Sequence, residues 1–186
     1  MENNMGTPVK RLDDEDSVYA LLKARLAEAR KLAVLGAGSA LRADDAAGVR
    51  VAEKLRGEFG AAVNPNLLIC VGETAPENFC GKIAKFSPDL LIVIDAADLG
   101  LEAGAIAEIQ PGAVGGLSFC SHMLPLKMMI DYLERETGKP SMILGVQYKD
   151  ISFDGPMTPE IGASVDMLFR ALRRSIAETL SSDVHI

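Results

Sequence analysis

The sequence is poor in the residues that build disulfide frameworks and zinc sites. It holds three cysteines and two histidines in 186 residues. Cys70, Cys80 and Cys120 are odd in number, and no two of them have the C-x-x-C spacing. These counts argue against a disulfide-stabilised domain and against a zinc knuckle. A reducing compartment suits such a chain best.

Positive charge and long apolar runs are also scarce. The formal net charge of −7 argues against a protein that binds nucleic acid or an anionic membrane, since both need a basic surface. The longest apolar run, from about Leu90 to Ala97, has the length of a strand and not of a membrane span. The opening residues, MENNMGTPVKRLDDEDS, contain no apolar segment of a secretory signal. We therefore expect a cytoplasmic protein with no nucleic-acid partner and no membrane insertion.

Apolar, strand-like runs alternate with helical patterns along most of the chain. Such alternation is typical of parallel strands joined by right-handed helical crossovers. We predict one α/β domain over residues 1–186, a three-layer sandwich with a mostly parallel sheet of about five strands and helices on both faces. The predicted strands lie at 32–35, 67–71, 89–98, 104–111 and 141–148.

Local sequence patterns predict a flexible tail and a helix near the N-terminus, and the start of the last helix near the C-terminus. Residues 1–14 are polar, and we expect a flexible tail there. Apolar residues at helical spacing predict an N-terminal helix over 15–30. Near the other end, Thr158-Pro159-Glu160 has the composition of a helix start, so the last helix is expected to begin there.

A glycine-rich stretch, LGAGSALRADDAAG, follows the first predicted strand. Its Gly36-x-Gly38 resembles half of a dinucleotide-binding loop, but Leu41 stands where the third glycine belongs. The acidic pair Asp44-Asp45 would repel a pyrophosphate at the following helix start, and no Walker A loop is present. A small nucleotide-binding α/β module is therefore a weak alternative, and we expect no nucleotide cofactor.

Three metal-ligand side chains follow the ends of predicted strands. Asp45 comes after the first strand, Asp95 ends the most apolar one, and His122 lies in the loop after the strand at 104–111. Sites in parallel sheets form at the carboxyl ends of the strands, so these residues are expected to converge. Two carboxylates and an imidazole suit Zn²⁺ or Ni²⁺ and leave positions open for a substrate group.

A simpler role is open for some of these residues. A lone aspartate at a helix start, such as Asp44 or Asp45, more often caps the helix. A lone loop histidine such as His122 is more often a surface or capping residue. Asp95 is harder to explain in this way, because a carboxylate that ends a strand as apolar as LLIVI is costly to bury without a partner.

The chain resembles the NiFe-hydrogenase maturation endopeptidases, in particular the branch that processes hydrogenase 3-type large subunits. The resemblance runs from about Ala33 to the last helix. Five segments carry it in order: LGAGSALRADDAAGVRVAEKL, ETAPENF, LLIVIDAADLG, SHMLPLKMMIDYL and ILGVQYKDISFDGPMTPEI. In that family the fold is a three-layer α/β sandwich.

The resemblance implies a nickel-dependent endopeptidase. Such an enzyme removes a C-terminal peptide from the precursor of a hydrogenase large subunit, and the nickel is supplied by that substrate. The positions that correspond to the family's nickel ligands are Asp45, Asp95 and His122. The family usually has asparagine where Ser39 stands and glycine near Ala46 or Ala47.

Two hypotheses for the function of such a chain differ in whether it catalyses a reaction. The first is the peptidase, acting through Asp45, Asp95 and His122 on a nickel-loaded precursor. The second is a docking partner that recognises nickel in the hydrogenase large subunit without cutting it. No serine or cysteine triad is visible in the sequence, which disfavours covalent catalysis.

Overall fold

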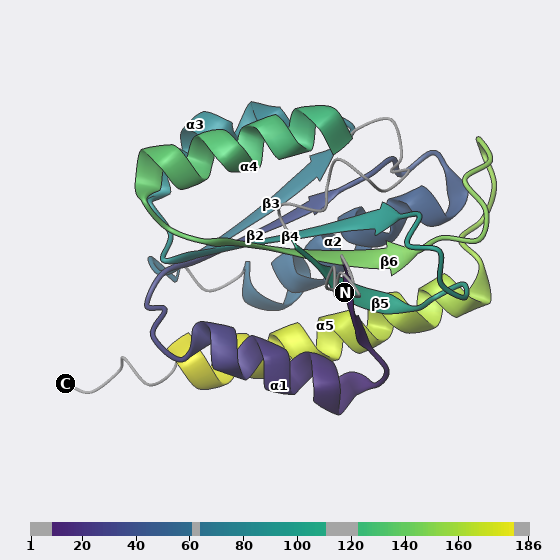
Figure 1. Ribbon diagram of the computed structural model, residues 1–186, viewed down its shortest axis with the longest axis horizontal. Helices are drawn as coiled ribbons and strands as arrows, with labels where there is room; N and C mark the ends of the chain where they lie inside the picture. The colour runs from purple at the N-terminus through teal and green to yellow at the C-terminus, as the bar shows by residue number, and fades with distance from the viewer. Residues whose placement is uncertain (1–8, 61–63, 111–122, 181–186) are drawn as a thin grey trace, which may run out of the picture.

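The fold is built on a six-stranded sheet with the order β1-β5-β6-β4-β2-β3 (Figure 1). The computed structural model describes residues 9–60, 64–110 and 123–180. Strands β2, β3, β4 and β6 run parallel, whereas β5 and β1 are antiparallel to their neighbours. The predicted mostly parallel sheet is therefore confirmed, with one strand more than expected. The strands are β1 Val9–Leu12, β2 Leu32–Ala37, β3 Leu67–Glu73, β4 Leu90–Ala97, β5 Ile106–Ile109 and β6 Ser141–Gln147.

Helices cover both faces of this sheet, as Figure 1 shows. On one face lie α1 (Glu15–Leu26), α2 (Ala47–Phe59) and α5 (Pro159–Leu180). The other face carries α3 (Cys80–Phe86) and α4 (Met123–Thr137). The three-layer prediction and the predicted start of the last helix are confirmed. Within 9–60, 64–110 and 123–180, no helix is both long and apolar enough to cross a membrane.

Strand β4 forms the centre of the two hydrophobic cores. All eight of its residues are buried. Because successive side chains point to opposite faces, Ile92 and Ile94 pack with α1, α2 and α5, whereas Leu91 and Val93 pack with α3 and α4. A strand covered on both sides in this way accounts for the continuous apolar run LLIVI. It also places Asp95, the next residue, in a dry environment.

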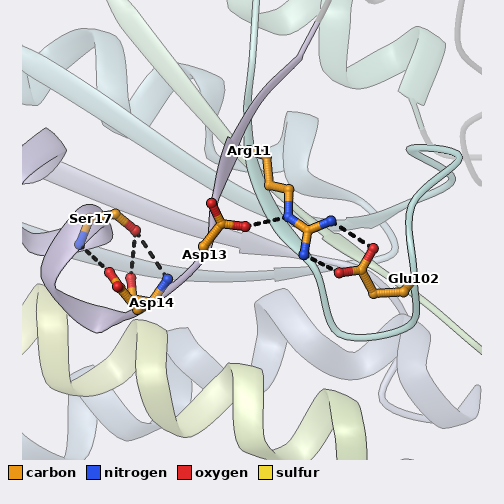
Figure 2. A network of polar contacts seen from close by, with 5 residues as sticks. All are labelled: Arg11, Asp13, Asp14, Ser17 and Glu102. Carbon is orange, nitrogen blue, oxygen red and sulfur yellow. Dashed lines mark hydrogen bonds and ion pairs between the residues drawn. The ribbon is translucent and has the colours of Figure 1, made fainter.

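The N-terminal segment differs from the prediction. Residues 9–12 were expected in a flexible tail, but they form the edge strand β1, which pairs with β5 and buries Leu12. Arg11 then donates to Asp13 and to both carboxylate oxygens of Glu102, as Figure 2 shows. Helix α1 ends at Leu26, four residues earlier than predicted.

Helix α2 approaches the sheet unusually closely, and glycine makes this possible. A Cβ atom on Gly48 would lie 2.1 Å from the carbonyl oxygen of Ile94 and 2.5 Å from that of Ala37. On the strand side, a Cβ atom on Gly36 would lie 2.1 Å from the carbonyl oxygen of Gly48. The start of α2, and the short 3₁₀ helix η1 (Ala43–Ala46) before it, therefore lie directly against the carboxyl ends of β2 and β4.

Candidate active site

Two buried aspartates meet at the carboxyl edge of the sheet. Asp45 belongs to η1, which follows β2, and Asp95 belongs to β4. Each is only 2 % exposed. Oδ1 of Asp45 and Oδ2 of Asp95 are fully buried and have no hydrogen-bond partner among the residues that the structure describes. Buried carboxylate oxygens are normally paired, so these two are available for a cation or a substrate group.

The glycine-rich loop holds Asp45 in place. The amide of Ser39 donates to Oδ2 of Asp45 at 3.0 Å. Gly38 has φ +121°, and a Cβ atom there would lie 1.8 Å from the carbonyl oxygen of Asp45 and 3.7 Å from Oδ1 of Asp95. The loop therefore directs its amide at a carboxylate of the protein itself, at the point where a nucleotide-binding loop would hold phosphate.

Burial alters the chemistry of Asp95. Loss of hydration, together with the negative charge of Asp45, raises the pKa of Asp95 to about 8, and a hydrogen bond from the amide of Ala96 only partly opposes this. Asp95 is therefore largely protonated at neutral pH. A divalent cation between the two carboxylates would displace that proton, since metal ligands must be deprotonated.

The departures from the family pattern do not strain this loop. The bond from Ser39 to Asp45 comes from the backbone, so any residue other than proline can make it at this position. Ser39 Oγ accepts from the amide of Leu41 at 3.3 Å. Ala46 and Ala47 have right-handed helical backbone angles, which alanine adopts without cost. The bond that holds Asp45 is therefore formed without asparagine at position 39 and without glycine at positions 46 and 47.

Asp44 has a different role from its neighbour. Its carboxylate accepts from the amides of Lys149, Asp150 and Thr158 and from the Thr158 hydroxyl. Neither η1 nor α2 has a side-chain cap at its N-terminus. The simpler interpretation, in which Asp44 or Asp45 caps the helix that follows it, is therefore wrong.

Gln147, which sequence analysis missed, shapes the loop after Asp95. It ends β6 and is 7 % exposed. Its Oε1 accepts from the amides of Leu99 at 2.6 Å and Leu101 at 3.2 Å, and its Nε2 donates to the Tyr148 carbonyl at 3.0 Å. Gln147 could have been found in the same way as Asp95, because both are polar residues at the end of an apolar strand.

The third predicted ligand, His122, lies outside the described residues. Helix α4 begins at the next residue, Met123, and packs against α3 and against η2 (Pro76–Phe79). The described part of the chain contains no group of three His, Cys, Asp or Glu side chains that could hold a metal ion. The structure thus brings together two of the three predicted residues, Asp45 and Asp95.

Comparison with curated proteins identifies relatives that match about three quarters of this chain. Hydrogenase 3 maturation protease of Escherichia coli K12 is 33 % identical over 140 residues, which are 75 % of this chain and 86 % of that protein. Hydrogenase expression/formation protein HupD of Bradyrhizobium diazoefficiens is 30 % identical over 76 % of this chain and 78 % of its own length.

Solved structures give the same result. The NiFe hydrogenase maturation protease HycI from Thermococcus kodakarensis superposes with a TM-score of 0.73 and 30 % identity, over 87 % of this chain and 99 % of that one. The endopeptidase HycI from Escherichia coli matches with a TM-score of 0.64 and 31 % identity, over 80 % and 91 %. The family model described as hydrogenase maturation protease matches residues 49–174. With the family model matching most of its length, the chain belongs to the hydrogenase maturation proteases, a family of endopeptidases.

Proposed function

We propose that this chain removes a C-terminal peptide from the precursor of a NiFe-hydrogenase large subunit and recognises the nickel that the precursor carries. The observation that carries the proposal is the pair of buried, unpartnered oxygens, Asp45 Oδ1 and Asp95 Oδ2. Two carboxylates at one edge of a sheet form an incomplete cation site. Such a site suits a metal that arrives with other ligands already bound.

His122 is the proposed third ligand. Imidazole nitrogen with carboxylate oxygen is a donor set that nickel accepts. Helix α4 starts at the following residue, and it packs against η2, which comes shortly after the end of β3. Asp45, Asp95 and His122 would then complete the coordination of the substrate nickel and hold the scissile segment beside it.

A protein substrate also fits the surface around this edge. Two large apolar side chains are exposed on the segments that border it, Leu41 (62 %) and Phe153 (71 %). The amide of Asp154 donates to the carbonyl of Leu41 at 2.8 Å, so the two segments are held together. A protein bound at this edge would cover these two side chains, which are otherwise exposed to water.

Cleavage of a nickel-loaded precursor tests the proposal. The purified protein is incubated with large-subunit precursor, with and without nickel, and the mass of the subunit is followed. We expect nickel-dependent loss of a C-terminal peptide, abolished in Asp45→Ala, Asp95→Ala and His122→Ala. Asp98→Asn is the matched control, because within the described residues Asp98 accepts only long bonds, of 3.3 and 3.5 Å, from Gly100 and Gln147.

Other outcomes assign a different role. Nickel-dependent complex formation with no change in mass would replace the peptidase with the docking partner. Cleavage that persists in Asp45→Ala and Asp95→Ala would show that the two carboxylates are not part of the reaction.

A further inference from the structure

Asp44 is the most completely bonded carboxylate at this edge. Its side chain is 0 % exposed. Oδ1 accepts from the amide of Thr158 at 2.7 Å. Oδ2 accepts from the amides of Lys149 at 3.0 Å and Asp150 at 2.9 Å, and from the Thr158 hydroxyl at 3.1 Å. With four donors and a fully buried side chain, this carboxylate is committed to contacts within the protein.

The bonds of Asp44 join two segments that are far apart in the chain. Its partners lie 105 to 114 residues later in sequence. Backbone bonds reinforce the connection, since the amide of Asp44 donates to the carbonyl of Asp150 at 3.0 Å, and that of Asp154 donates to Leu41 at 2.8 Å. The turn over residues 41–44 is thereby fixed to the segment 149–158.

The turn has two backbone bonds of its own, from the amide of Arg42 to Ser39 at 3.1 Å and from that of Asp45 to Arg42 at 2.8 Å, but its conformation calls for further support. Ala43 has φ +30°, a left-handed value that an L-residue with a Cβ atom adopts only under constraint. No side chain caps the start of η1. Asp45 itself has one described side-chain hydrogen bond, from the amide of Ser39. The orientation of Asp45 therefore depends on how firmly the preceding residues are anchored.

We propose that Asp44 is a positioning residue, which clamps η1 to the segment 149–158 and so holds the Asp45 carboxylate against Asp95. Asp44 touches neither substrate nor metal; it acts only through Asp45. The expected effect on cleavage rests on the proposed function, whereas the expected effect on the position of Asp45 does not. Failure of the positioning role of Asp44 can therefore be distinguished from failure of the proposed function.

Asp44→Asn is the primary variant. An asparagine retains one acceptor oxygen and turns its NH₂ group towards either the Thr158 amide or the amides of Lys149 and Asp150, so a donor faces a donor. The hydrogen bonds on one side of the Asp44 carboxylate are then lost. Because the amide of Ser39 donates to the Asp45 carboxylate, its proton resonance in an amide ¹H–¹⁵N spectrum reports directly on where that carboxylate lies.

Two further variants provide a milder change at the same contact and a matched control. Thr158→Val removes the hydroxyl, which bonds both Asp44 and the Glu160 side chain, and retains the three backbone donors to Asp44, so a smaller change is expected. It also supplies the test if Asp44→Asn does not fold. Asp150→Asn is the matched control. In the part of the chain that the structure describes, its side chain accepts only from Ser152, at 2.8 and 2.9 Å, and it lies exposed in the same segment.

We expect the Ser39 amide proton to move upfield in Asp44→Asn, less so in Thr158→Val, and not in Asp150→Asn. With nickel-loaded precursor, kcat/KM should fall by roughly a hundredfold in Asp44→Asn, since Asp45 is proposed both to bind the substrate nickel and to align the scissile segment. An unchanged Ser39 resonance in the variants that fold would overturn the proposal, even with cleavage reduced. A shifted resonance without cleavage by the parent protein would uphold it and refute the proposed function instead.

Discussion

The ionisation of a single residue, Asp95, should be visible in the stability of the whole protein. Its pKa is raised from 3.8 to about 8 by burial and by the charge of Asp45. Between these two pH values the folded state holds a proton that the unfolded state has released, so the free energy of unfolding falls as pH rises. At about 1.4 kcal/mol per unit of pKa, a shift of about four units corresponds to a loss on the order of 6 kcal/mol, complete above about pH 8.

Asp95→Asn removes this titration and should flatten the profile. Urea denaturation of the parent protein and the variant, measured at a series of pH values without metal, gives the difference between the two. We expect the variant to gain stability relative to the parent as pH rises from about 4 to about 8. Asp98→Asn, which alters a partly exposed carboxylate, should follow the parent. Parallel profiles for the parent and Asp95→Asn would contradict the raised pKa.

How far single residues could be predicted depended on whether their surroundings were local in sequence. Asp95 could be singled out because the apolar strand before it implies burial, and Asp45 because it follows a glycine-rich strand end. The role of Asp44 could not be predicted, since all of its donors lie more than 100 residues away. From the sequence, the local role expected for Asp44 was to cap the following helix.

Among the helices, α2 carries a matched pair of glycines that tests its close packing. A Cβ atom on Gly48 would lie 2.1 Å from the Ile94 carbonyl oxygen, whereas one on Gly57 would meet nothing within 4 Å. We expect Gly48→Ala to destabilise the protein by about 2–3 kcal/mol or more, because backbone atoms cannot yield as a side chain does. Gly57→Ala should stabilise it by roughly 0.5–1 kcal/mol through helix propensity.

Urea denaturation measures both variants, and the sign of the difference is the decisive result. If Gly48→Ala were as stable as the parent, α2 would not pack against the sheet as closely as described. In that case η1 would also lose the support that places Asp45 next to Asp95.

Most strands and helices could be predicted from the hydrophobic pattern of the sequence. The exception, strand β1, shows where such a pattern gives no signal. Strand β4 was evident because burial on both faces requires an unbroken apolar run. Strand β1 was missed because Val9–Leu12 lies at the sheet edge, where Lys10 and Arg11 remain exposed. Its pairing with β5 is formed by backbone atoms and by one buried side chain, Leu12, and neither leaves a periodic signal in four residues.

For the molecule as a whole, the surface that meets the substrate should include Leu41 and Phe153. They are exposed on two segments that backbone hydrogen bonds join, and one of these segments leads directly into η1 and Asp45. A partner protein would bury these side chains when it places its nickel at the site, and aromatic side chains often dominate such contacts.

Phe153→Ser should therefore raise KM for the nickel-loaded precursor by roughly tenfold and leave kcat and the melting temperature unchanged, since the contact is remote from the reacting atoms. Tyr132→Ser is the control, because Tyr132 is 49 % exposed on α4, a helix of the opposite face of the sheet. A fall in kcat with KM constant would instead place Phe153 in the alignment of the reacting groups. Equal effects of the two variants would show that cleavage does not depend on this border of the site.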